Sequence, residues 1–129
     1  MVENLIQNIE KAIETDKQKP NLGMIDIEKV KELYNNGAII LDVRPPAKVS
    51  GKTMEEAGIK NALYVPVVEF TKHLDRLPQN KDAVIITTCN LVKFANRVMG
   101  YLEALGYKNV YTFDGSTQEL MEVLSQKVN

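Results

Sequence analysis

The stretch from Val84 to Tyr107, VIITTCNLVKFANRVMGYLEALGY, joins a continuous apolar run to a segment with helical spacing. A short apolar run such as Ala83–Thr87 is typical of a strand that is buried on both faces of a parallel sheet. Over residues 93–105, apolar side chains recur every three to four positions, and Gly106 can provide the left-handed cap that ends a helix. The stretch therefore predicts a buried strand, a short loop and a helix.

The same alternation extends along the rest of the chain. Further apolar runs predict strands near residues 38–43, 62–65, 83–88 and 109–113, and helical spacing predicts helices near 2–16, 27–34, 68–77, 93–105 and 118–124. Short apolar strands that alternate with helices indicate a parallel sheet covered by helices on both faces. We therefore expect an α/β fold of three layers with a mostly parallel central sheet.

The first residues of the chain stand apart from this alternation. Lys19-Pro20-Asn21-Leu22-Gly23 is typical of a linker, so we expect an N-terminal helical extension over 1–19 and one domain over 20–129. The extension places one apolar stripe along its helix, formed by Leu5, Ile6, Ile9 and Ile13. Leaving such side chains in water forgoes about 1.5–3 kcal/mol each. We expect the stripe to pack on the domain or on a second copy of the chain, as a homodimer.

Composition narrows the classes of function. The 129 residues suit one domain, and a net charge of −1 gives no reason to expect nucleic acid or a membrane as a partner. We find no apolar run of about 20 residues and no basic leader followed by an apolar block, so we expect a cytoplasmic protein. A single cysteine and a single histidine exclude an intramolecular disulfide and argue against a zinc site. We expect neither a metal nor a cofactor.

Cys89 lies where chemistry is expected in such a fold. Sites in open parallel sheets form at the carboxyl ends of the strands, and Cys89 follows the third predicted strand just before a helix. Loop amides and the positive end of the helix would stabilise a thiolate there, which is the reactive form of the side chain. We therefore expect the sulfur at the mouth of a pocket. The alternative is a buried structural cysteine, since free cysteines are commonly buried.

Three segments carry a resemblance to a known family. They are GMIDIEKVKELYNNGAIILDVRPP at 23–46, AGIKNALYVPVVEF at 57–70 and AVIITTCNLVKFANRVMGYLEALGYKNVYTFDGS at 83–116. In this order and spacing the segments resemble the single-domain rhodaneses, the thiosulfate sulfurtransferase family. The combination of Leu-Asp-Val-Arg-Pro with the later Leu-Gly-Tyr-x-Asn-Val-Tyr is the most specific part. The resemblance implies a rhodanese-like fold, and the extension up to about residue 19 lies outside it.

The resemblance also implies roles for individual residues. Cys89 matches the cysteine that takes up sulfane sulfur as a persulfide and passes it on. The loop that cradles this sulfur with backbone amides matches Asn90, Leu91, Val92, Lys93 and Phe94. Asp42 and Arg44 match a pair near the site, and an internal ion pair or support of a turn is the favoured interpretation of Asp42. The implied donor is thiosulfate or a persulfide, and the implied acceptor is a thiol, cyanide or another protein.

The loop departs from the family pattern in ways that affect activity. Many members have Gly, Arg and Ser at positions that hold Val92, Phe94 and Ala95 here. Valine lacks the conformational freedom of glycine, and phenylalanine offers no charge, so Lys93 is the only fixed charge left in the loop. We expect a sulfurtransferase that is weak with the dianion thiosulfate. The alternative is an inactive rhodanese-like module that binds or regulates a partner.

A third class of function, a cysteine phosphatase on a related fold, conflicts with the sequence. Such an enzyme needs an arginine six positions after the cysteine, because a bidentate guanidinium must hold the phosphoryl oxygens. That position is Ala95. The sequence therefore argues against a phosphatase.

Overall fold

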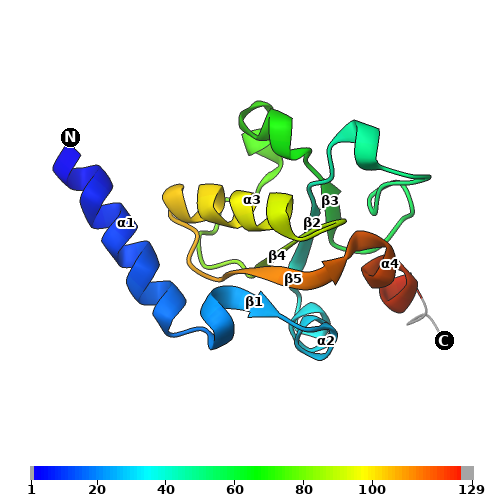
Figure 1. Ribbon diagram of the computed structural model, residues 1–129, viewed down its shortest axis with the longest axis horizontal. Helices are drawn as coiled ribbons and strands as arrows, with labels where there is room; N and C mark the ends of the chain where they lie inside the picture. The colour runs from blue at the N-terminus through cyan, green and yellow to red at the C-terminus, as the bar shows by residue number, and fades with distance from the viewer. Residues whose placement is uncertain (1, 126–129) are drawn as a thin grey trace.

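The computed structural model describes residues 2–125 and contains a parallel five-stranded sheet in the order β1-β5-β4-β2-β3 (Figure 1). The strands are β1 (Met24–Ile25), β2 (Ile39–Asp42), β3 (Ala62–Tyr64), β4 (Ile85–Cys89) and β5 (Val110–Ser116). The helices are α1 (Val2–Lys17), α2 (Ile27–Asn35), α3 (Lys93–Ala104) and α4 (Thr117–Ser125), with 3-10 helices η1 (Pro20–Gly23), η2 (Pro46–Lys48) and η3 (Val67–Arg76). The expected α/β fold with a parallel sheet is confirmed. No helix within residues 2–125 has the length and apolar character needed to cross a membrane.

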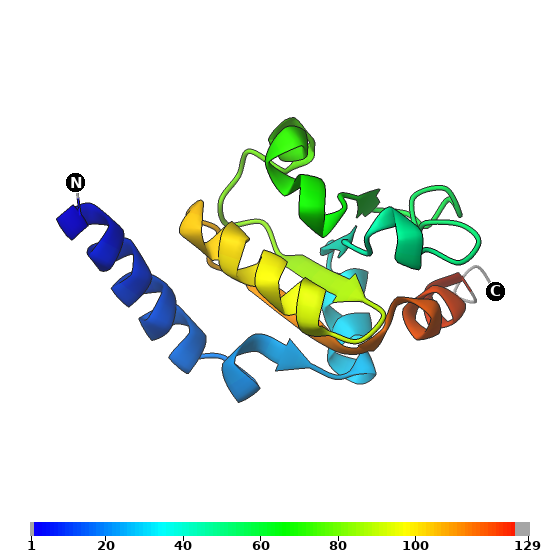
Figure 2. The same cartoon turned by 45° about the horizontal axis from the view of Figure 1, so that its top comes forward.

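The sheet separates two halves of the core. Helices α3 and η3 cover one face, and α2 and α4 cover the other (Figures 1 and 2). Neighbouring strand residues alternate between the halves, so that Ile85 packs beneath α3 and Ile86 packs towards α2 and α4. Every residue of β4 is buried, which explains why this strand is apolar without alternation in its sequence.

The boundaries of the strands differ from the sequence expectation in ways that matter for the site. β4 ends at Cys89, so the cysteine is the last residue of the strand and pairs with Ser116 of β5. β1 was not expected, because two residues are too few to give a periodic signal. It pairs with β5 at the edge of the sheet, where Met24 lies opposite Thr112.

The helix expected over 68–77 is a 3-10 helix, η3, with breaks at Glu69 and His73, where φ is −122° and −126°. Its buried side chains are Val67 and Phe70, three residues apart. This spacing matches the three residues per turn of a 3-10 helix, so the tighter helix directs both side chains into the core. A helical segment at this place is confirmed, and its type is 3-10.

Helix α1 projects from the domain rather than lying on it (Figures 1 and 2). Its contact with α3 involves the edge that carries the partly buried Ala12 and Asp16. The apolar stripe of Leu5, Ile6, Ile9 and Ile13 stays more than half exposed. Packing of this stripe on the chain's own domain was therefore a wrong expectation. Just after the end of α1, the chain is held to the domain by the buried Lys19, whose ammonium donates to the carbonyl oxygen of Val110 at 2.6 Å.

Candidate active site

Cys89 receives a backbone hydrogen bond from the helix that follows it. The N–H of Ala95 donates to the sulfur, with a distance of 3.2 Å between nitrogen and Sγ. Ala95 lies in the first turn of α3, where backbone N–H groups have no partner within the helix. These free donors and the helix dipole favour negative charge at this position. The sulfur therefore faces the backbone donors at the N-terminal end of α3.

The sulfur is nevertheless closed off from solvent. Cys89 has an exposed fraction of 0%, and it packs in the core half that also contains Ala95 and Val98. The expectation that the sulfur lies at the mouth of a pocket was therefore wrong, because Cys89 is packed into the core beneath α3. A sulfur donor could reach Sγ only after a local rearrangement around Cys89.

The loop between β4 and α3 consists of Asn90, Leu91 and Val92, and its backbone is strained at Val92. Val92 has a φ of +76°, a left-handed conformation that β-branched residues rarely adopt. Glycine adopts such a positive φ at no steric cost, so the valine at this position of the loop carries strain that the glycine of many family members would avoid. The amide of Asn90 fastens the loop to η2 by donating to the carbonyl oxygen of Lys48 at 2.9 Å. Leu91 projects into solvent and is 80% exposed.

The two remaining residues of the predicted loop begin α3 and offer little charge to the sulfur. The exposed Lys93 ammonium lies 5.2 Å from the centroid of the Phe94 ring. The Phe94 ring is half-buried and packs against the core beneath α3. In the described part of the chain, the donor that reaches Sγ is the neutral N–H of Ala95. The predicted loop residues thus surround Cys89 along the chain, but they do not supply a cationic contact to its sulfur.

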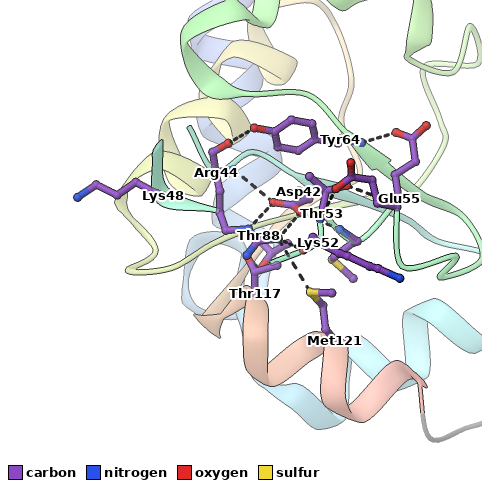
Figure 3. Close-up of polar contacts among 12 residues, drawn as sticks. Asp42, Arg44, Lys48, Lys52, Thr53, Glu55, Tyr64, Thr88, Thr117 and Met121 are labelled. Carbon is purple, nitrogen blue, oxygen red and sulfur yellow. Dashed lines mark hydrogen bonds and ion pairs between the residues drawn. The ribbon is translucent and has the colours of Figure 1, made fainter. Parts of the chain in front are cut away.

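Asp42 and Arg44 form a buried ion pair with two parallel hydrogen bonds (Figure 3). Nε of Arg44 lies 2.9 Å from Oδ1 of Asp42, and Nη2 lies 2.8 Å from Oδ2. The same carboxylate accepts the N–H of Met54 at 3.0 Å, while Nη2 donates to the carbonyl oxygen of Lys52 at 3.2 Å. The pair therefore fastens the end of β2 to the segment around residue 53. The interpretation of Asp42 as part of an internal ion pair is confirmed.

A second polar group holds this segment against η3. Glu55 accepts the N–H of Tyr64 at 2.9 Å (Figure 3). It also pairs with Arg76, whose guanidinium donates to the Tyr64 carbonyl oxygen. The hydrogen bond from Arg76 holds the pKa of Glu55 below its usual value. The hydroxyl of Tyr64 completes the link by donating to the carbonyl oxygen of Arg44 at 2.8 Å. These contacts support the strand ends beside the site.

Sequence reasoning missed Ala95 and Thr87. The hydroxyl of Thr87 donates to the carbonyl oxygen of Ala95 at 2.9 Å, so both polar groups of Ala95 are held by β4 residues. Ala95 contributes only its backbone, and Thr87 stands in an apolar run, so neither side chain suggested a role. The available signal was the position of Ala95 in the first turn of the predicted helix, where free N–H groups are expected.

The sequence matches the family model of the rhodanese-like domain over residues 26–122. The match includes Asp42, Arg44, Cys89 and the loop that follows. The chain belongs to the rhodanese-like domain family. No curated protein matches it.

Solved structures share this rhodanese-like fold. One is the human single-domain sulfurtransferase TSTD1, with 21% identity over 78% of this chain and 96% of that chain and a TM-score of 0.56. Another is a rhodanese homolog from the extremely thermophilic bacterium Thermus thermophilus, with 23% identity over 74% and 96% of the two chains and a TM-score of 0.54. A protein from Lactobacillus plantarum aligns over 95% of each chain, with 16% identity and a TM-score of 0.51. Family membership supports a role in sulfur transfer.

Proposed function

We propose that this rhodanese-like chain is a sulfurtransferase or sulfur carrier that moves sulfane sulfur through a persulfide on Cys89. The observation that carries the proposal is the hydrogen bond from the Ala95 N–H to Sγ at the first turn of α3. A donor in this place stabilises the thiolate that attacks and the negative charge that a bound persulfide carries. The matching family supports the same chemistry.

Two displacements complete the transfer without net oxidation. The Cys89 thiolate attacks the outer sulfur of a persulfide R–S–SH, the S–S bond breaks, and RS⁻ leaves with the bonding electrons and takes up a proton. Cys89 then carries the group –S–SH. An acceptor thiolate or cyanide attacks this outer sulfur, forms a new persulfide or thiocyanate, and returns the Cys89 thiolate.

The site favours donors of low charge over thiosulfate. Thiosulfate is a dianion, but the hydrogen-bond donor at Sγ is the neutral N–H of Ala95. Phe94 adds no charge, because its apolar ring packs against the core. One charge-assisted hydrogen bond contributes about 1.5–3 kcal/mol, and its absence slows a reaction roughly 10- to 100-fold. Because Cys89 is buried, thiosulfate must also lose its hydration to reach Sγ, which raises the activation barrier further. We therefore propose a persulfide on a small thiol or on another protein as the better donor.

The acceptor in this proposal is a thiol, cyanide or a protein, and the reaction takes place in the cytoplasm. A reducing compartment keeps a single cysteine free for each cycle. Neither step requires a metal or a cofactor, because the sulfur atoms supply the nucleophile and the leaving group.

A second candidate function is an inactive rhodanese-like module that binds or regulates a partner. It is favoured by the complete burial of Cys89 and by the strained Val92 in the loop that follows it. In this case Cys89 would act only as a small core residue.

Intact-mass measurement after incubation with each donor separates the two functions. A mass gain of one sulfur atom with a small-thiol persulfide, absent from the Cys89→Ser variant, is the expected result. Thiosulfate should give slower loading of the same atom. Absence of loading with any donor would support the inactive module. Rapid turnover with thiosulfate would contradict the proposed preference and leave the persulfide mechanism intact.

A further inference from the structure

Helix α1 presents an uncovered apolar face, which we define as the α1 stripe. Its members share one side of the helix and are each 51–65% exposed: Val2, Leu5, Ile6, Ile9 and Ile13. Five neighbouring large apolar side chains form a continuous patch, unlike single exposed residues, which are common on any protein surface. The patch therefore requires an explanation in terms of binding.

A groove between α1 and α3 continues this surface. It has a volume of about 360 Å³, and its α1 side includes Leu5, Ile9 and Ile13 of the stripe. Its α3 side includes Gly100 and Ala104, whose small side chains leave room for another element. An occupant that covers the stripe would also fill this groove.

Helix α1 lacks the packing that normally stabilises a helix of its size. It has 16 residues and none of them is buried. Helices of about 12–15 residues are marginal in water, and in proteins their stability comes mainly from packing of an apolar face. Here the anchor at Lys19 and an edge contact with α3 hold the helix, while its apolar face has no cover within the described chain.

We propose that the α1 stripe is covered by α1 of a second copy of this chain, packed antiparallel about a two-fold axis. A two-fold axis brings the same surface of both copies together, so one sequence supplies both faces. Ile9 lies near the middle of the stripe and thus near the axis. Leu5 of each copy then lies close to Ile13 of the other.

The charges beside the stripe favour this antiparallel pairing. Glu3, Glu10 and Lys17 are seven residues apart and therefore lie along one edge of the helix. Antiparallel pairing brings Glu3 near Lys17 of the second copy at both ends of the helix pair. These two attractions outnumber the one repulsion between the two Glu10 side chains. In parallel pairing about a two-fold axis, this edge of each helix faces the opposite edge of the other copy, so the contacts between Glu3 and Lys17 are absent.

The proposed dimer contact lies away from Cys89. The groove lies towards the C-terminal end of α3, at Glu103 and Ala104, whereas Cys89 contacts the first turn of that helix. The 12 residues of α3 separate its ends by about 18 Å. The inference therefore does not depend on the proposed sulfur chemistry.

Light scattering and sedimentation of the full chain test the dimer. The parent chain should have twice the mass of one chain at micromolar concentrations. Ile9→Lys brings two ammonium groups together at the axis and should weaken association at least 100-fold, which is about 2.8 kcal/mol. Gln7→Lys adds the same charge to the opposite face of α1 and should leave the dimer intact. Circular dichroism checks that both variants keep their helices.

A crosslinking measurement tests the orientation independently. In a Cys89→Ser chain, Ile9→Cys provides the only thiol and places it near the axis, so mild oxidation should give a covalent dimer. Gln7→Cys in the same background should crosslink far more slowly. A monomeric parent chain, an Ile9→Lys variant that still dimerises, an assembly larger than a dimer, or equal crosslinking at both positions would each overturn the proposal.

Discussion

The hydroxyl of Thr87 donates a hydrogen bond to the carbonyl oxygen of Ala95 at 2.9 Å, and the N–H of Ala95 in turn donates to the sulfur of Cys89. β4 thus fixes Ala95 at both of its backbone polar groups. The hydroxyl also lies 3.0 Å from that of Thr112 on β5, which anchors it in the buried sheet. Thr87 is therefore a positioning residue that acts on Cys89 through Ala95.

Replacing Thr87 by valine keeps the shape of the side chain and removes its hydroxyl. We expect a loss of about 1–3 kcal/mol in the free energy of unfolding, because buried polar groups lose a partner. Persulfide loading of Cys89, measured per folded molecule by intact mass, should slow roughly 10-fold as the Ala95 N–H shifts. Thr87→Ser should restore the rate.

The neighbouring Thr88 provides the control. Its hydroxyl lies 3.0 Å from that of Thr117 and does not reach α3. Thr88→Val should therefore lower stability by a similar amount and leave the loading rate unchanged. Equal loading rates in the two valine variants would show that Thr87 has a structural role alone.

Val92→Gly tests the strain in the loop between β4 and α3. A non-glycine residue held at a positive φ costs about 1–3 kcal/mol, whereas the extra freedom of glycine in the unfolded chain costs about 0.5–1 kcal/mol. We expect a net gain of roughly 1 kcal/mol in stability, measured by urea unfolding. Leu91→Gly removes an exposed side chain one position earlier and should not stabilise the protein. A destabilised Val92→Gly variant would show that the valine contacts outweigh the backbone strain.

The buried pair of Asp42 and Arg44 should contribute far more to stability than the exposed pair of Glu55 and Arg76. Asp42→Asn leaves a guanidinium that is 2% exposed without a countercharge, and we expect a loss of about 3–5 kcal/mol. Glu55→Gln removes a pair in which both side chains are about one-third exposed, so the loss should stay near 1 kcal/mol. Urea unfolding of both variants measures the difference. Similar losses would contradict the structural role of the buried pair.

The sequence predicted the parts of the fold that depend on long apolar patterns. β4 and α3 followed from the continuous run before Cys89 and the helical spacing after it. β1 could not be predicted, because a strand of two residues at the sheet edge is defined by its pairing with β5 rather than by its own pattern. The breaks in η3 arise from the way Val67 and Phe70 enter the core, which local spacing does not reveal.

The candidate site was predicted in position but not in accessibility. A cysteine at the carboxyl end of a strand follows from the order of the elements, whereas its burial depends on how side chains of other elements pack around it. Ala95 contacts the sulfur through its backbone N–H, so the identity of its side chain gives no prediction of this contact. The exposed stripe of α1 also depends on three-dimensional context, because the spacing of its apolar residues does not show which surface covers them.

The buried Lys19 ammonium lies beside Glu103, an acidic side chain with an unusual pKa. The carboxyl of Glu103 is nearly buried, with one oxygen 3.7 Å from the Lys19 ammonium, and the same ammonium lies 3.3 Å from Asp16. Burial, together with the hydrogen bond that the protonated Glu103 carboxyl donates to Asp16, raises the pKa of Glu103 from 4.5 to about 8. Glu103 is therefore largely protonated at neutral pH in the folded chain, and its ionisation would add a second carboxylate beside a single ammonium.

Stability should consequently fall as the pH rises. Between pH 4.5 and about 8, the unfolded chain releases the Glu103 proton while the folded chain retains it, so higher pH favours unfolding, and the effect levels off above pH 8. Glu103→Gln keeps a neutral side chain of similar shape. The variant should match the parent near pH 4.5 and exceed it near pH 8 by several kcal/mol, up to roughly 5 kcal/mol, in urea unfolding. Glu14→Gln, which alters an exposed pair with Lys17, should leave the pH dependence unchanged. Parallel curves for the parent and Glu103→Gln would rule out this ionisation as the cause.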